Sequence, residues 1–427
     1  MTDDRYGHPL AEALAPDLLE RFLRYAAIDT QAALGSDTVP STAKQLELSR
    51  LLVDELRELG VADAELVGAV VYGTIPGTVE GTPVVALFAH VDTALDAAGG
   101  PVVPLVHERW DGTPIVLPGD PRQVLDPAEL PELAARVGHD LVTSDGTTLL
   151  GADDKAGVAA IMAAAKTLLG DDRPRTTVRV VFTTDEEIGY GADRVDLERV
   201  GAHFGYTLDG GNPGEMELET FSAYEASVEV RGVPSHTGDA KGRMVNALKL
   251  AAAIVAELPD DRWSPETTEG REGFVHPYVL EGGMEHARLL FLVRDHDDAL
   301  LDAHVEALRV IVDRVAAREP RAEVTFGVRE QYRNMRSIID RHPAVVQAAV
   351  AAMGRLGLEV SHPIIRGGTD GSRLSAMGLP TPNIFTGMQA IHSVKEWLSV
   401  QDAALAAATV VELARVVGEG GVPRPGV

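Results

Sequence analysis

Short apolar runs that alternate with helical stretches are the feature that most constrains how this chain can fold. Residues 84–89, 178–182 and 204–208 are rich in β-branched or aromatic side chains and are too short for helices. Residues 156–169, between two of these runs, have the length and composition of a helix. Strands that alternate with helices are typical of an α/β fold, so we expect a mostly parallel sheet flanked by helices.

Two further segments fit this layout. Residues 16–27 carry apolar side chains at helical spacing, and Thr42 with Gln45 has the spacing of a capping box for a helix that ends near Gly60. Residues 96–148, by contrast, are rich in Pro, Gly and Asp and show weak periodicity. We expect a long irregular excursion there.

The pattern changes at Tyr224. From there the chain predicts a strand, a helix, two strands, a helix and a strand, which is the β-α-β-β-α-β order of a ferredoxin-like α+β unit. After about Arg333 the α/β character returns. We therefore expect a discontinuous first domain, residues 1–220 and 333–427, and an inserted second domain, residues 221–332.

Charge and composition exclude several kinds of partner and site. The 65 acidic and 38 basic residues give a formal net charge of -27, which argues against nucleic acid and anionic membranes as partners. The acidic start lacks the features of a secretory signal, and no long apolar run could span a membrane, so we expect a cytoplasmic protein. The chain has no cysteine, so any metal ion must be held by His, Asp and Glu.

Acidic residues or histidine follow four strand-like segments, at the edge where open α/β sheets place their ligands. Simpler explanations stay open for each: a His-Asp pair that caps a strand, an aspartate that caps a helix, or a solvated acidic turn. Three consecutive acids repel one another unless positive charge lies between them. The residues are His90 and Asp92, Asp153 and Asp154, the triplet Asp185 to Glu187, and Asp209.

A second imidazole is available at His392, after the inserted domain. One histidine on each side of that domain, with carboxylates between, could hold two divalent ions about 3.5 to 4 Å apart, bridged by one aspartate. A bound divalent ion lowers the pKa of water to about 7, and a nearby carboxylate outside the ligand set can take the proton. The chemistry indicated is hydrolysis of an amide.

The chain resembles the peptidase T family of tripeptide aminopeptidases, which are co-catalytic dinuclear zinc exopeptidases. The resemblance extends over nearly the whole chain, and LLGADDKAG together with RGGTDG is highly specific. The segments that carry it are His90 to Thr93, Leu149 to Gly157 (LLGADDKAG), Asp185 to Glu187, Asp209 to Gly211, Arg366 to Gly371 (RGGTDG) and Pro382 to Gly387 (PNIFTG).

The resemblance implies five ligands for two divalent ions, most often Zn²⁺. Asp153 would bridge the two ions. His90 and Asp209 would complete the coordination of one ion, and Glu187 and His392 that of the other.

The resemblance also implies catalytic roles outside the ligand set. Glu186 matches the general base, and Asp92 matches the residue that orients the first histidine ligand. The inserted domain matches the family's smaller domain, often called a lid, and His236 within it matches a histidine that steadies the oxyanion of the tetrahedral intermediate. Without the resemblance, His236 would be read as an ordinary loop histidine.

Three residues lie in stretches that resemble family segments near the substrate. They are Arg294, Asn334 and Arg366, and arginine is well suited to hold the terminal carboxylate of a peptide. Structural roles are equally open, because Arg294 could pair with an aspartate that follows it and Arg366 could only brace the Gly367-Gly368 turn.

The resemblance therefore predicts an aminopeptidase that removes the N-terminal residue from short peptides, tripeptides above all, through a water that bridges two divalent ions. The alternatives are a related dipeptidase, carboxypeptidase or N-acyl-amino-acid deacylase on the same scaffold, and a peptide-binding module without catalysis. A short peptide is the expected partner, and a homodimer is left open.

Overall fold

The computed structural model describes residues 4–420 and divides into two compact units. The first contains Met1–Leu218, Met335–Pro363 and Thr369–Val427, and the second contains Glu219–Asn334 and Ile364–Gly368. The second unit thus includes a short segment that the sequence pattern had assigned to the first. Backbone bonds explain this, because the amide of Phe221 donates to the carbonyl of Gly367 and that of Ile365 to the carbonyl of Glu219.

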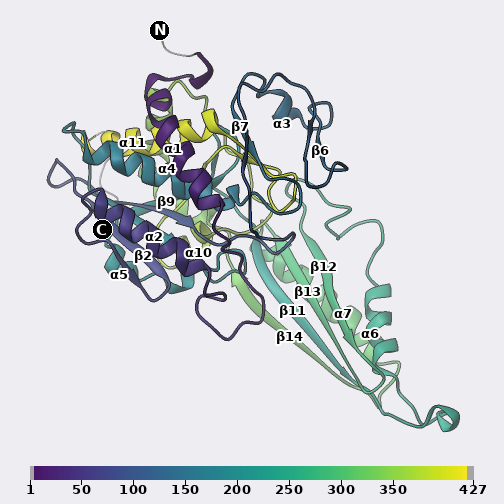
Figure 1. Cartoon of the computed structure of the whole chain (residues 1–427). Helices are drawn as coiled ribbons and strands as arrows, with labels where there is room; N and C mark the ends of the chain where they lie inside the picture. The colour runs from purple at the N-terminus through teal and green to yellow at the C-terminus, as the bar shows by residue number, and fades with distance from the viewer. Residues whose placement is uncertain (1–3, 421–427) are drawn as a thin grey trace. The chain divides into compact units, whose positions relative to one another are not determined.

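A seven-stranded sheet forms the centre of the first unit (Figure 1). Its middle strands β8, β3, β9 and β15 are parallel, but β1, β2 and β10 pair antiparallel. The predicted parallel arrangement therefore holds for the middle of the sheet, and the sheet as a whole is mixed. From one edge to the other the strands are β1 (Glu65–Val67), β2 (Val70–Ile75), β8 (Val178–Thr183), β3 (Val85–His90), β9 (Phe204–Gly210), β15 (Asn383–Phe385) and β10 (Met216–Glu217).

The antiparallel pairing of β1 with β2 has a local cause. Strands β1 and β2 are joined by a tight turn in which Gly68 has a left-handed φ of 63°, a conformation that glycine adopts without a steric penalty. A turn this short can only join antiparallel strands, because parallel neighbours need a crossover connection.

Helices cover the sheet of the first unit. Helices α1, α4 and α11 pack on one another, and α4 also packs on β3 and β9. Helix α4 is rich in alanine and buried on almost every side, so it lies close to the strands. The helices include α1 (Pro9–Ala26), α2 (Gln45–Glu58), α3 (Pro131–Ala134), α4 (Ala152–Leu169), α5 (Leu197–Val200), α8 (Arg336–Ile339), α9 (Pro343–Arg355), α10 (Asp370–Ala376) and α11 (Val400–Gly418), with the 3-10 turns η1 (Asp4–Tyr6) and η2 (Ala192–Arg194). None of the helices in the described part of the chain is both long enough and apolar enough to cross a bilayer.

The excursion predicted over residues 96–148 contains short strands, and two of them form a sheet with strands from near the C-terminus. The order of that sheet is β16-β17-β7-β4, and Trp397 of β17 is buried in its core. The segment between β16 and β17, which carries His392, is thereby attached to the excursion. The strands are β4 (Leu105–His107), β7 (Leu141–Thr143), β16 (Met388–Gln389) and β17 (Trp397–Ser399), and β5 (Ile115–Val116) pairs separately with β6 (Val124–Leu125).

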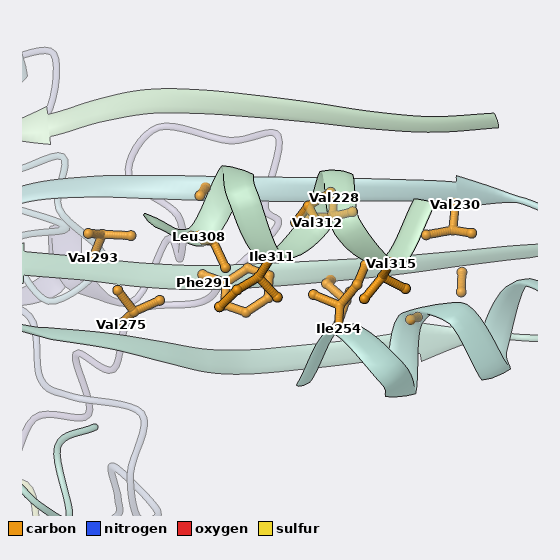
Figure 2. Close-up of a cluster of buried hydrophobic side chains, with 14 of the residues drawn as sticks. Val228, Val230, Ile254, Val275, Phe291, Val293, Leu308, Ile311, Val312 and Val315 are labelled. Carbon is orange, nitrogen blue, oxygen red and sulfur yellow. The ribbon is translucent and has the colours of Figure 1, made fainter. Parts of the chain in front are cut away.

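The second unit is a four-stranded antiparallel sheet with two helices, α6 and α7. Its strand order is β12-β13-β11-β14, and the elements follow one another as the alternating sequence pattern predicts. Figure 2 shows apolar side chains such as Phe291, Ile254 and Ile311 between the strands and the helices. The elements are β11 (Ser222–Arg231), η3 (Thr237–Asp239), α6 (Ala247–Ala256), β12 (Phe274–Gly282), β13 (His286–Asp295), α7 (Asp298–Ala316) and β14 (Glu323–Tyr332).

Truncation of the Phe291 ring tests this core. We expect Phe291→Ala to lower the free energy of unfolding by about 3 to 5 kcal/mol, because the ring is fully buried and its removal leaves a cavity. Leu300→Ala on α7 is the control, since Leu300 is 53% exposed and should change stability by no more than about 0.5 kcal/mol. Urea unfolding followed by circular dichroism measures both, and equal losses would contradict the packing described.

Candidate metal centre

The carboxyl ends of neighbouring parallel strands bring the predicted residues together at one edge of the large sheet. His90 is the last residue of β3, Asp209 lies near the end of β9, and the acidic triplet follows β8. The Nε2 atom of His90 is 3.7 Å from a carboxylate oxygen of Asp209. Parallel pairing of β3 with both β8 and β9 fixes this proximity.

Asp153, at the start of α4, lies between the two predicted histidines. One of its carboxylate oxygens is 3.0 Å from Nε2 of His90, and the other is 3.4 Å from Nε2 of His392. His392 Nε2 is also 3.2 Å from a carboxylate oxygen of Glu187. Asp153 therefore presents one oxygen to each imidazole, as a bridging carboxylate would.

Two groups of potential metal ligands result, and Asp153 belongs to both. The first is His90, Asp153 and Asp209, and the second is Asp153, Glu187 and His392; in each group the ligand atoms lie within 4.8 Å of one another. Among the described residues, the Oε1 atom of Glu187 is buried and has no hydrogen-bond partner. Imidazole nitrogens and carboxylate oxygens are ligands that zinc and related divalent ions accept, so these residues fit a pair of such ions.

The acids of these groups show the effect of crowded, buried negative charge. Burial, together with the neighbouring Asp153 carboxylate, raises the pKa of both Glu187 and Asp209 to about 7. Burial raises the pKa of Glu186 well above its usual range. Burial alone would raise the pKa of Asp153 as well, but hydrogen bonds from His392 and His90 lower it. Cations would relieve this repulsion.

The His90 ring contacts Asp92 through a different atom from the one that the sequence suggested. The Nδ1 atom of His90 is 3.1 Å from the main-chain oxygen of Asp92 and 3.6 Å from its carboxylate. The two carboxylate oxygens instead accept hydrogen bonds from the backbone amides of Glu186 and Glu187, each at 3.1 Å. The main chain of Asp92 thus orients the His90 ring, and its side chain holds the turn that carries the two glutamates.

The same turn is fixed from its other side by Asp185, which has a left-handed φ of 64°. Its carboxylate accepts hydrogen bonds from the Ser41 hydroxyl at 2.5 Å, Gln45 Nε2 at 2.6 Å and Arg194 at 2.5 Å. The predicted capping box is therefore wrong: α2 begins without a side-chain cap, and buried Gln45 bonds Asp185 instead.

Four acidic residues around the centre were not among the predicted ligands and catalytic residues. Asp154 accepts hydrogen bonds from the amides of His90 and Gly157, and Asp370 accepts them from Thr183 Oγ1 and Ala192 N. Asp154 lies in the LLGADDKAG motif and Asp370 in the RGGTDG motif, so these motifs could have indicated that both residues lie near the centre. The other two, Asp96 and Glu396, contact the segments that carry His392 and Asp153.

The two arginines predicted to bind substrate belong to the second unit, and their guanidinium groups bond backbone oxygens. Arg294 donates to the carbonyl oxygens of Tyr224 and Val293. Arg366 donates to the carbonyl oxygens of Gly270 and Glu272, at 2.8 and 2.9 Å. Both arginines therefore have structural partners, but these partners differ from the aspartate and the glycine turn considered in the sequence. Substrate binding by either arginine stays a prediction.

Asn334 and His236 also lie in the second unit. Asn334 Nδ2 donates to the carbonyl oxygen of His296 at 3.0 Å. The Nδ1 atom of His236 accepts a hydrogen bond from the amide of Gly238 at 3.2 Å, and the residue is solvent-exposed. Their predicted parts in substrate binding and oxyanion stabilisation stay predictions.

Proteins similar to this chain in sequence include peptidases. Residues 140–416 match the family model described as peptidase family M20/M25/M40. Peptidase T of Geobacillus kaustophilus (strain HTA426) is 42% identical over 403 residues, which are 94% of this chain and 98% of that protein. The chain belongs to peptidase family M20/M25/M40. As a member of the M20 family it is a hydrolase.

Solved structures of other peptidases share the fold. A tripeptidase from Staphylococcus aureus subsp. aureus Mu50 superposes with a TM-score of 0.74 at 24% identity, over 95% of this chain and 99% of the other. A dinuclear metal-binding peptidase of the M20 family from Bacillus subtilis gives a TM-score of 0.63 at 18% identity, over 96% and 99%. Both likenesses extend over almost the full length of this M20 chain.

The raised pKa values of the candidate ligands predict how the stability of the metal-free protein depends on pH. Glu187 and Asp209 keep protons in the folded state up to about pH 7, where the unfolded chain has released them, so stability falls as the pH rises toward that value. Hydrogen bonds to Asp153 and Glu187 raise the pKa of His392 to about 11, and the stability this gives is also lost as the pH rises. We therefore expect the chelator-treated protein to unfold at a lower urea concentration at about pH 8 than at about pH 5.5.

Added divalent ions should reverse that trend, because they bind the ionised carboxylates and the neutral imidazoles. The gain in the urea midpoint on addition of Zn²⁺ should be larger at about pH 8 than at about pH 5.5. Equal midpoints for the chelator-treated protein at both pH values would contradict the charge distribution described.

Proposed function

We propose that this chain is a metal-dependent aminopeptidase that removes the N-terminal residue from short peptides, tripeptides above all. The observation that carries the proposal is the pair of ligand groups that share Asp153, with Glu186 directly before the ligand Glu187. Relatives named peptidase T, and a tripeptidase with the same fold, support the substrate class.

Two divalent ions, Zn²⁺ by preference, would be held by the two groups. His90 and Asp209 would bind one ion, Glu187 and His392 the other, and Asp153 both. Such ions, when bound, supply Lewis acidity toward the scissile carbonyl and lower the pKa of water. The dinuclear metal-binding peptidase with the same fold supports the number of ions.

Glu186 is the proposed general base. It lies outside both ligand groups, it is half-buried, and desolvation raises its pKa, so its carboxylate can accept a proton from water and return it to the leaving amine. The backbone bond to Asp92 and the left-handed turn at Asp185 fix the position of the Glu186 main chain. Asp92 thus serves the base and the His90 ring together.

The remaining roles follow the resemblance. We propose that the first unit is the catalytic domain, that the ferredoxin-like second unit is a lid and that His236 in it stabilises the oxyanion. Arg294, Asn334 and Arg366 are the proposed substrate-binding residues. A cytoplasmic location stays a prediction from the sequence.

Substitution of the two adjacent glutamates separates the base from the ligand. Glu186→Gln should leave about two metal ions per chain and lower turnover of a tripeptide at least about 100-fold, because only the proton acceptor is lost. Glu187→Gln should lower the metal content as well as the turnover. Metal analysis and initial rates measure both, and normal metal content in both variants would refute this division of roles.

A peptide panel tests the proposed substrate class. We expect release of the N-terminal residue from free tripeptides, weaker activity on free dipeptides and tetrapeptides, and none on the N-acetylated peptides of the same lengths. Chromatography of the products identifies which bond is cut. Preference for N-acetylated peptides, or release of the C-terminal residue, would indicate a deacylase or a carboxypeptidase instead.

A further inference from the structure

We propose that Glu396 is a positioning residue that sets the geometry of the second metal position by joining the segment of Asp153 to the segment of His392. This inference rests on the proposed two-metal function and adds a residue to it that lies outside the ligand set.

Both carboxylate oxygens of Glu396 accept hydrogen bonds from backbone amides. One oxygen accepts hydrogen bonds from the amides of Leu150 and Gly151, each at 2.8 Å, and the other accepts one from the amide of Asp153 at 2.9 Å. Glu396 is only 1% exposed, so these bonds are shielded from water.

These amides lie where the helix itself offers them no hydrogen-bond acceptor. They precede or open helix α4, where amide groups have no carbonyl partner within the helix. Gly151, the residue at the helix start, has a left-handed φ of 76° and no side chain that could cap it. Glu396 supplies the missing acceptor from 243 residues away, and it thereby fixes the backbone of the bridging aspartate, Asp153.

Glu396 also belongs to the segment that carries His392. It lies four residues after His392 and directly before Trp397 of β17, which is buried. Strand β17 pairs with β7, so the base of this segment is held in a sheet. The carboxylate of Glu396 is therefore a direct link between the backbone of one ligand and the anchored end of the segment of another.

The link matters more for the metal position of His392 than for that of His90, because His392 is held less firmly by its own segment. His90 lies in a central strand and its side chain is 3% exposed. His392 lies between strands, has a left-handed φ of 59°, and its side chain is 42% exposed. Outside the ligand groups its ring contacts Asp96, whose carboxylate is 3.0 Å from Nδ1. Movement of the Asp153 and His392 segments would therefore affect the second position most, because that position takes ligands from both segments and the first position takes only Asp153.

Glu396→Gln tests the proposal, because an amide keeps the size of the side chain but has one acceptor oxygen in place of two. The metal-free variant is titrated with Co²⁺, followed by visible absorption and equilibrium dialysis. We expect the second equivalent to bind at least about 10-fold more weakly, with an altered spectrum, and the first equivalent, which depends on Asp153 but not on His392, to be weakened less. Glu55→Gln is the matched control, since Glu55 is buried, bonds Arg24 and Tyr25 on α1, and should leave both equivalents unchanged.

Wild-type affinity and spectrum for both equivalents in Glu396→Gln would overturn the proposal. Fewer than two bound Co²⁺ per chain in the unsubstituted protein would overturn the two-metal function instead, so the two failures are distinguishable. If Glu396→Gln does not fold, Glu396→Asp replaces it, because its carboxylate keeps the charge but is one methylene too short to reach all three amides. The same pattern of weakening is expected, and unchanged binding of both equivalents would overturn the proposal.

Discussion

Repulsion between carboxylates at one sheet edge is the constraint on which the rest of the site depends. The acidic residues at this edge reduce that repulsion in two ways. Some accept backbone amide hydrogens and act as fixed acceptors, while others face the two imidazoles and are free to bind cations. The fixed acceptors are Asp92, Asp154 and Glu396, and the proposed ligands are Asp153, Glu187 and Asp209. Neighbouring acids in one motif thus have different functions.

Local patterns predicted much of this arrangement. Apolar runs that end in acids or histidine indicated β3, β8 and β9 and the edge where they meet, because a buried parallel strand has a recognisable composition. The alternation after Tyr224 predicted the second unit in the same way. The antiparallel edge strands were missed, since pairing direction depends on the connection and not on the strand's own residues.

Contacts between distant segments could not be predicted. Gln45 has the spacing of a helix cap, yet it bonds Asp185 across 140 residues of chain. Glu396 and Asp96 are ordinary acidic residues in the sequence, and only the fold brings them to the ligand segments. The arginines of the second unit are a further example, because Arg294 bonds a carbonyl oxygen 70 residues away and Arg366 one that is 96 residues away within that unit.

The separation of the ligands along the chain implies an order of assembly. His90, Asp153 and Asp209 all precede the second unit, whereas His392 follows it. A chain that folds as it is synthesised can therefore close the first three-ligand group before the residues of the second unit emerge, but the other group must wait for a much longer loop to close. An ion bound early would occupy the position of His90 and Asp209. The position of Glu187 and His392 would be filled second, after the second unit has been synthesised.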